Sequence, residues 1–387
     1  MSVHPEHVDI AIVGGGPVGA ALALALRDSG LAVALLEARN EFVSRDPRAI
    51  ALSYGSRLIL EKLEAWTWLK ARATAIEIIH VSQRGGFGRV RLTAGEAGVP
   101  ALGYTVEYGD LCRALAKGLP SSGASLVTGA RVTAVRPASG CGMVVYESAG
   151  QTHELSARLI VQADGGRSLQ GEHRVKDYGA SALVCTVRTN RPHAHVAYER
   201  FTAEGPIALL PLHEDYALVW TTPADMVEER LALDETAFLA QLQAAFGDRQ
   251  GRFLAAGARA AFPLRLVSAS LGGQPGLVRI GNAAQTLHPV AGQGLNLGLR
   301  DVWKLACSIL DSPREALGSS HFLSRYRAGR RGDVAGGIAM TDLLVEVFSN
   351  DLPVLGQARG LALTLMDAVP ATKRLFARKM MFGAQAW

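Results

Sequence analysis

Three glycines near the start of the chain have the spacing of a nucleotide-binding turn. Gly14, Gly16 and Gly19 follow a short apolar run at 8–13 and precede an Ala- and Leu-rich segment at 18–28 that is typical of a helix. Gly14 allows a tight turn, Gly16 lets the backbone approach a pyrophosphate, and Gly19 lets the helix pack closely on the strand. The free N–H groups at the start of such a helix favour an anion.

An acidic residue completes this pattern. A second apolar run at 31–36 ends at Glu37, about as far from Gly14 as the carboxylate that holds a ribose hydroxyl normally lies. Strand, glycine turn, helix and strand together form a βαβ unit. The segment therefore predicts dinucleotide binding, whereas the glycines alone would also fit an ordinary tight turn.

A second motif, residues 163–168, follows the buried apolar run at 159–161. Asp164 and Gly165 form an Asp-Gly pair, which is ordinary turn chemistry. The same pair at a strand end can also place a carboxylate and bare backbone beside a phosphate or ribose. The residues leave both interpretations open.

The third motif, residues 281–296, begins at a strand end and finishes at a helix start. Gly292 and Gly294 bare the backbone just before the helix expected from Leu295. This gives the chain a second helix N-terminus that can face negative charge. Two such sites predict a long ligand held at both ends, and FAD fits, with its pyrophosphate at one end and its isoalloxazine ring at the other.

The remaining patterns predict the elements that position these motifs. A helix is expected at 47–63, with Asp46 as its N-cap and Pro47 in its first turn. Short strands are expected within 76–92, 126–162, 178–222, 260–266 and 277–280, and helices at 111–119, at 234–246 and from 295 onward.

We therefore expect an α/β protein with a Rossmann-like FAD-binding domain, an inserted β-sheet lobe and a helical C-terminal region. The FAD-binding domain would be discontinuous, comprising 1–66, 109–171 and 271–310. The lobe would comprise 67–108 and 172–270, and the C-terminal helical region 311–387.

Composition excludes several classes of protein. Of 387 residues, 49% are hydrophobic, which excludes a disordered chain, and the four cysteines are too scattered for a disulfide scaffold. The net charge of +5 is not gathered into an aromatic-rich basic stripe, so nucleic-acid binding is not expected. No signal peptide, transmembrane segment or metal-ligand spacing is evident. We expect a cytoplasmic protein.

The three motifs together resemble those of the class A flavoprotein aromatic hydroxylases, which share the p-hydroxybenzoate hydroxylase fold. With residues 46–56 (DPRAIALSYGS) and 205–211 (GPIALLP), the chain is more similar to the ubiquinone-biosynthesis hydroxylases. Within these it most resembles the 2-polyprenyl-6-methoxyphenol hydroxylase type. The resemblance covers about residues 7–310 and is looser beyond.

The resemblance implies roles for single residues. Glu37 would hold the adenosine ribose, Arg48 would lie along the cofactor unless it is merely an exposed helix residue, and Val132 would touch adenine through its main chain. The implied cofactor-binding set is Gly14, Gly16, Pro17, Val18, Gly19, Glu37, Ala38, Arg48, Val132, Asp164, Gly165, Asn282, Pro289, Gly292, Gln293, Gly294, Leu295 and Asn296.

Three positions depart from the family pattern. Asn282 stands where most relatives have Asp, although an amide can still hydrogen-bond a ribityl hydroxyl. Gly171 replaces an arginine after the second motif, which argues against a nicotinamide-linked role there. Tyr108 stands where many relatives have an arginine that reaches the flavin phosphates.

The resemblance implies an FAD-dependent aromatic monooxygenase. NADPH or NADH would bind transiently and reduce FAD, O₂ would form a C4a-hydroperoxyflavin, and this would hydroxylate the ring of a polyprenylated phenol. The catalytic base is not identified: His288 is a candidate or a structural histidine, Pro289 would face the substrate, and Tyr216, His213 or a water chain could deprotonate the phenol.

A polyprenylated substrate dissolves in the bilayer, so we expect peripheral contact with the inner face of the membrane. The C-terminal region combines apolar residues with Arg359, Lys373, Arg374, Arg378 and Lys379, which suits acidic lipid. Helices that pack on the body, or on other ubiquinone-biosynthesis proteins, would give the same pattern. Residues 205–212 and 216–221 could form walls of an apolar substrate pocket or simply sheet core.

Two other functions fit the same sequence. One is a class A hydroxylase of a small soluble aromatic compound. The other is a non-catalytic flavin-binding component of the ubiquinone biosynthetic complex, which the intact third motif argues against.

Overall fold

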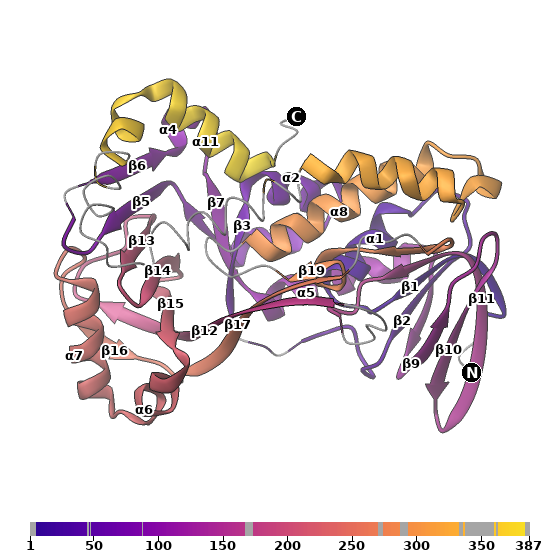
Figure 1. Cartoon of the computed structure of the whole chain (residues 1–387), viewed down its shortest axis with the longest axis horizontal. Helices are drawn as coiled ribbons and strands as arrows, with labels where there is room; N and C mark the ends of the chain where they lie inside the picture. The colour runs from indigo at the N-terminus through magenta and orange to yellow at the C-terminus, as the bar shows by residue number, and fades with distance from the viewer. Residues whose placement is uncertain are drawn as a thin grey trace.

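The computed structural model describes residues 5–44, 46, 48–86, 88–166, 173–269, 274–286, 293–332, 336, 360 and 363–383. Two large sheets lie at opposite ends of the molecule, and the two long strands β12 and β17 run between them (Figure 1). Helices surround both sheets, so the α/β class expected from the sequence is confirmed.

The first sheet contains the βαβ unit that the sequence predicts. Its strand order is β8-β2-β1-β11-β10-β9, with β18 beside β11, and β1, β2, β8, β11 and β18 are mutually parallel. The bounds are β1 His7–Val13, β2 Val33–Glu37, β8 Ser125–Thr128, β9 Arg131–Arg136, β10 Gly142–Ser148, β11 Gln151–Gln162 and β18 Leu277–Arg279. Helix α1, Pro17–Ala25, connects β1 to β2.

Both faces of this sheet are covered, which explains why its central strands are continuous apolar runs. Ile10, Ile12 and Leu35 pack on one side with the helices, and Ala11 and Leu36 pack on the other. All five side chains are buried.

The second sheet has the order β19-β17-β12-β15-β14-β13-β5-β6, with β16 beside β12. The bounds are β5 Ile78–Gln83, β6 Arg89–Thr93, β12 His173–Thr189, β13 Val196–Thr202, β14 Gly205–Leu212, β15 Asp215–Pro223, β16 Phe253–Ala256, β17 Ala260–Ala269 and β19 Gln285–Thr286. The strands predicted within 76–92, 178–222 and 260–266 are therefore present. Helices α6, Val227–Ala232, and α7, Glu235–Phe246, lie beside this sheet (Figure 1).

The helix expected at 47–63 is wrong in its first part. Strand β3, Ala49–Ser53, comes first and pairs with β7, Gly103–Glu107, which also pairs with β4, Thr74–Ile76. Helix α2 begins only at Tyr54, because Ser53 is the N-cap and its hydroxyl accepts a hydrogen bond from the Ser56 N–H. The partner strand β7 is distant in sequence, so local patterns did not reveal it.

The remaining helices lie between the strands given above and in the C-terminal part of the chain. Their bounds are α2 Tyr54–Lys62, α3 Trp66–Leu69, α4 Ala94–Ala97, α5 Tyr108–Gly118, α8 Gln293–Leu310, a helix over 320–332, and α11 Pro370–Phe382; short 3₁₀ turns are η1 Lys70–Arg72, η2 Leu119–Ser121, η3 Ala224–Met226, η4 Gly281–Ala283 and η6 Arg314–Ala316. The helices predicted at 111–119 and 234–246 are confirmed. In the described ranges, no helix combines the length and apolar character that a membrane crossing needs.

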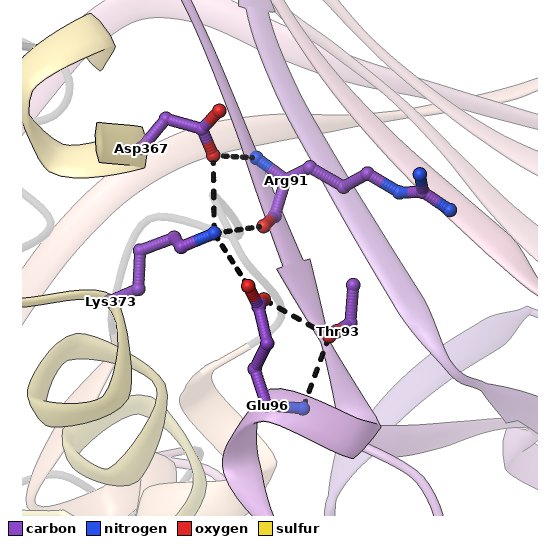
Figure 2. Close-up of polar contacts among 5 residues, drawn as sticks. All are labelled: Arg91, Thr93, Glu96, Asp367 and Lys373. Carbon is purple, nitrogen blue, oxygen red and sulfur yellow. Dashed lines mark hydrogen bonds and ion pairs between the residues drawn. The ribbon is translucent and has the colours of Figure 1, made fainter. Parts of the chain in front are cut away.

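A buried lysine fastens the C-terminal helix α11 to the second sheet. Lys373 Nζ lies 2.8 Å from Glu96 Oε1 on α4 and 3.5 Å from Asp367 Oδ1, and also 3.5 Å from the Arg91 carbonyl of β6. Figure 2 shows these contacts converging on the lysine, with Thr93 holding Glu96 from the other side. One of the basic residues expected to face lipid is therefore an internal tie.

The described strands fall into two large sheets, but the domain boundaries expected from the sequence stay a prediction. Segment 67–108, expected wholly in the lobe, is shared: β5 and β6 join the second sheet, whereas β4 and β7 form the small sheet with β3. Strand β19 pairs with β17, although its residues were expected in the first domain.

Candidate functional site

The structure brings the three sequence motifs together. The bare α-carbon of Gly14 faces the backbone of Asp164 so closely that an added Cβ would lie 2.6 Å from the Asp164 Cα. Val18, in the first turn of α1, packs against Gly281 and Gly298, where a Cβ would lie 3.0 Å and 2.9 Å from its methyl groups. The N-terminal parts of α1 and α8 are thus held beside each other.

The start of α1 has the features of an anion site. Gly16 is the N-cap and offers no side-chain oxygen to the first-turn N–H groups, and no acidic side chain lies in that turn. A Cβ on Gly16 would meet nothing nearer than the Tyr108 hydroxyl at 4.0 Å, so the space above the turn is open. A Cβ on Gly19 would lie 1.9 Å from the Gly14 carbonyl oxygen, so Gly19 is required for packing.

Glu37 ends β2 with a buried carboxylate. Its Oε2 accepts from the Gly15 N–H at 2.8 Å, and its Oε1 accepts from the Arg39 backbone N–H and side-chain Nε at 2.9 and 2.8 Å. Burial opposes ionisation, but the hydrogen bonds and charge of Arg39, with the Gly15 N–H, hold the pKa of Glu37 below its usual range. An ionised acceptor therefore stands at the strand end.

Arg39 is a site residue that sequence reasoning missed. Its guanidinium clamps Glu37 and also donates to the Val43 carbonyl at 3.4 Å. The only sequence signal is an arginine two residues after the ribose-type acid. Beside this pair, the exposed Ala38 follows β2, and the Glu37 carbonyl accepts from the Ala130 N–H at 2.8 Å. This contact places the start of β9, with the half-buried Val132, next to the strand end.

Arg48 lies just before β3 and not on a helix. Its Nε contacts the Asp46 carboxylate at 2.7 Å, and its guanidinium lies 4.4 Å above the Phe262 ring of β17 and 5.8 Å from the Tyr108 ring. Arg48 therefore joins the segment before β3 to strand β17 of the second sheet. Burial raises the pKa of Tyr108 to about 12, so that hydroxyl stays neutral where relatives place an arginine.

Asn296, in the first turn of α8, is a fully hydrogen-bonded anchor. Its Oδ1 accepts from the Ser53 N–H at 2.8 Å and the Ser56 hydroxyl at 2.7 Å, and its Nδ2 donates to the Ala51 carbonyl at 2.9 Å. These bonds direct the side chain toward β3 and α2. What Asn296 offers a ligand is therefore the position of the α8 N-terminus.

The other predicted residues of the third motif lie around the same helix start. Gln293, Gly294 and Leu295 form the first turn of α8, and a Cβ on Gly294 would meet only the Asn282 amide oxygen, at 3.7 Å. Asn282 itself is exposed on η4. His288, Pro289 and Gly292 lie outside the described residues.

The Asp-Gly motif forms the turn that its chemistry predicts. Asp164 Oδ1 accepts from the Gly166 N–H at 3.0 Å, and Gly165 and Gly166 have φ of 73° and 87°. The local geometry thus fits an ordinary turn. This turn also packs against Gly14, so it supports the nucleotide-binding turn from below.

The two alternative phenol bases, Tyr216 and His213, lie in different surroundings in the second sheet. Tyr216 is buried on the α7 side, its hydroxyl donates to the His193 carbonyl at 3.4 Å, and burial raises its pKa. His213 sits half-exposed in the β14–β15 turn, where its backbone N–H donates to Thr74 and its Nε2 lies 3.8 Å from Glu107. Within the described ranges no cluster of three or more potential metal ligands occurs.

The site combines an open glycine turn, a buried carboxylate that can accept from a ribose, and a second helix N-terminus that begins with glycine. These three features lie side by side, and they fit the pyrophosphate, ribose and ring of FAD. The fold and site therefore define a class of protein, the FAD-binding flavoproteins. The chain belongs to the family described as "FAD binding domain", whose sequence model matches residues 7–338.

Curated relatives and solved structures agree with this membership. The chain is 36% identical to ubiquinone hydroxylase UbiL of Rhodospirillum rubrum, over 96% of this chain and 89% of that one. It is 32% identical to 3-demethoxyubiquinol 3-hydroxylase of Escherichia coli, over 95% and 97%. The fold matches p-nitrophenol 4-monooxygenase of Pseudomonas putida with a TM-score of 0.80 at 16% identity, over 98% and 100%. The predicted class, an FAD-dependent monooxygenase, is confirmed.

Proposed function

We propose that this protein hydroxylates the aromatic ring of a polyprenylated phenol in ubiquinone biosynthesis, with NADPH or NADH as reductant and O₂ as oxidant. The observation that carries the proposal is the end-to-end similarity to relatives named ubiquinone hydroxylases, combined with the convergence of all three FAD motifs. The 2-polyprenyl-6-methoxyphenol hydroxylase type is the form that the sequence motifs favour.

The chain's own residues would hold and orient the cofactor. Backbone N–H groups at the start of α1 would bind the pyrophosphate, and Glu37 would accept from the adenosine ribose. The α8 N-terminus, fixed by Asn296, would face the ring and favour negative charge on it. Bound FAD supplies the oxygen-transfer chemistry, and the protein must keep water away from it.

The direct test is an assay of the purified FAD-loaded protein. With NADPH and a prenylated phenol in detergent, we expect bleaching of the flavin, O₂ consumption and a product that carries one atom of ¹⁸O from ¹⁸O₂. Turnover of short soluble phenols alone would favour the small-aromatic alternative. Failure of NADPH to reduce the flavin would favour a scaffold role. The precursor that accumulates in a deletion strain would identify the ring position.

We also propose that α11 and the helical segment 363–368 before it dock on an acidic membrane face, which would give access to a prenylated substrate. Leu365, Val369 and Leu375 are exposed there, with exposed fractions of 56%, 44% and 58%. Exposed Arg374, Arg378 and Lys379 lie on the same helix and can attract anionic headgroups. We call this set of six exposed residues the docking surface: 365, 369, 374, 375, 378 and 379.

Vesicle flotation tests this docking surface. The wild-type protein should float with vesicles containing phosphatidylglycerol and much less with pure phosphatidylcholine. Leu375→Asp should abolish flotation, and Arg378→Glu should weaken it several-fold at low salt. Binding that is unchanged by both substitutions would instead favour helices that serve as a contact for other biosynthetic proteins.

A further inference from the structure

The second sheet has two unlike faces. On the face toward α7, Leu183, Ile207 and Trp220 are fully buried in a cluster with Phe238 and Leu242. Side chains alternate between faces along a strand, so the neighbours of these residues point the other way. On β14 the burial alternates accordingly: Ile207 and Leu209 are buried, whereas Ala208 and Leu210 are only partly buried.

The residues of this second face line up in one row across the sheet. Strand register pairs Val184 with Val219, Val219 with Ala208, Ala208 with Glu199, and Glu199 with Val81. All five are partly accessible although they lie on interior strands. Other elements therefore do not fully cover the central row on this face of the sheet.

This face lies between two contacts with other parts of the chain. At one end, Phe262 of β17 shares the face through its pairing with Ala182 and lies beneath the Arg48 guanidinium. At the other end, Phe201 packs with Leu102 and with Met381 of α11. Val184, Val219 and Ala208 belong to neither cluster within the described part of the chain.

Glu199 is the one ionisable member of this row. It has no hydrogen bond or ion pair to the described residues, and no charge on them perturbs it. The titratable side chains of neighbouring positions point away: Arg200 lies by the Phe246 ring on the α7 side, and the His80 ring contacts Tyr198 there at a tilt of 43°. The charged group of α11 nearest this sheet, Lys373, is held by Glu96 and Asp367.

We propose that Glu199 is the catalytic base that takes the proton from the phenolic hydroxyl of the substrate, with the ring lying on the row from Val184 to Val81. The small apolar side chains of the row would contact the apolar ring, and the single carboxylate would accept from its O–H group. The inference rests on the proposed function. In the step, the phenol O–H bond breaks, its electron pair stays on the phenol oxygen, and the proton bonds to a Glu199 oxygen.

The environment suits this role. Burial raises the pKa of Glu199 from 4.5 to about 7, which narrows the gap to a phenol with a pKa of about 10. The proton transfer is then favoured about 300-fold more than it would be to an ordinary glutamate. The phenolate that forms is richer in electrons at its ring carbons, which favours oxygen transfer, and Glu199 is reset when it returns the proton to the product oxygen.

The first test is the activity of the FAD-loaded enzyme on two phenols: a probe, 2-geranylphenol, and the more acidic 2-geranyl-4-nitrophenol, which is already ionised in solution at the assay pH. Glu199→Gln should lose most of its activity on the probe but much less on the nitrophenol, because that ring binds already as the phenolate. Glu199→Gln should still bind the probe within about threefold of the wild type, as judged by perturbation of the flavin spectrum. Glu228→Gln, an exposed residue on α6, is the control and should match the wild type.

The second test is the pH profile of kcat/KM for hydroxylation of the same probe. In the wild type it should rise through about pH 7, because the carboxyl must be ionised to accept the proton. Glu199→Gln should lose this limb and fall about 100-fold or more. If the glutamine variant does not fold, Glu199→Asp, which withdraws the carboxylate by one methylene, should fold and fall at least tenfold.

The outcomes separate the two proposals. An equal loss of activity on both phenols in Glu199→Gln, or an unchanged pH profile in Glu199→Gln or Glu199→Asp, would overturn the role of Glu199 while wild-type hydroxylation upholds the proposed function. A wild-type enzyme that reduces its flavin but hydroxylates no prenylated phenol would overturn the proposed function and, with it, this base.

Discussion

Gly16 and Gly19 are three residues apart, yet their surroundings demand glycine for different reasons. A side chain at Gly19 would collide with the Gly14 carbonyl, whereas a side chain at Gly16 would enter open space. The second glycine is therefore required for the fold, and we expect the first to be required for the ligand. This distinction is visible only when the backbone of the turn is placed.

Substituting each of these two glycines by alanine should therefore have a different effect. Gly16→Ala should leave the melting temperature of the apoprotein within about 2 °C of wild type but weaken FAD binding at least tenfold, because the methyl group occupies the pyrophosphate approach. Gly19→Ala should destabilise the apoprotein by several kcal/mol. Gly95→Ala, where an added Cβ meets nothing within 4 Å, is the control. Flavin fluorescence and thermal unfolding measure the two effects, and equal FAD affinity in Gly16→Ala and wild type would contradict the assignment.

Glu37 gives a pH-dependent prediction. Its pKa is lowered from 4.5 in the folded protein, so its ionised form stabilises the fold above about pH 4.5, and this contribution is lost as pH falls through the lowered value. Glu37→Gln should lower the free energy of unfolding by about 2 kcal/mol at pH 7. Urea unfolding from pH 7 to pH 3 should show this difference shrinking, and a difference independent of pH would refute the electrostatic explanation.

At the scale of elements, short side-chain ties hold segments that are remote in sequence. Asn296 links α8 to β3 and α2, and Lys373 links α11 to α4 and β6. Each tie satisfies polar groups that burial would otherwise leave unpaired. The C-terminal helix therefore packs on the body through Lys373, while its other side stays exposed.

Lys373→Met should loosen α11 without affecting FAD. The Nζ–Glu96 contact involves a carboxylate that is 44% exposed, so we expect a loss of about 1 kcal/mol, or roughly fivefold faster hydrogen exchange over 363–383. Lys379→Met, on the exposed side of the helix, is the control. Exchange that is equally slow in both variants would show that apolar contacts alone hold α11.

At the scale of the whole molecule, FAD is expected to join parts of the chain that are almost 300 residues apart. The starts of α1 and α8 meet through Val18, Gly281 and Gly298, and the cofactor would lie across both. A ligand that binds only the folded state stabilises it by mass action. Removing FAD should therefore loosen both regions together.

Hydrogen exchange of apo and FAD-loaded protein tests this coupling. At a free FAD concentration 100 times the Kd, the loaded protein should gain about 2.7 kcal/mol, and residues 14–19 and 293–300 should gain protection in parallel. Helix α7, beyond the second sheet, serves as the internal reference and should change little. Protection at only one of the two helix starts would contradict a cofactor held at both ends.

The sequence by itself determined the βαβ unit, the identity of the nucleotide-binding turn and most strands and helices, because apolar periodicity and glycine spacing are local properties. It linked the motifs of Gly14 and Asn282 to one long ligand, whereas a family resemblance was needed to add Asp164 to them. It missed Arg39 as the partner of Glu37, because the contact depends on how the chain turns after β2.

Only the tertiary structure decided the contacts between distant segments. Strand β3 replaced the first part of an expected helix because β7 pairs with it from 50 residues away. Lys373 was expected to face lipid and instead lies among Glu96 and Asp367. Glu199 carries no local signal, and the role proposed for it follows from strand register, which sets the face of the sheet and hence the surroundings of every side chain.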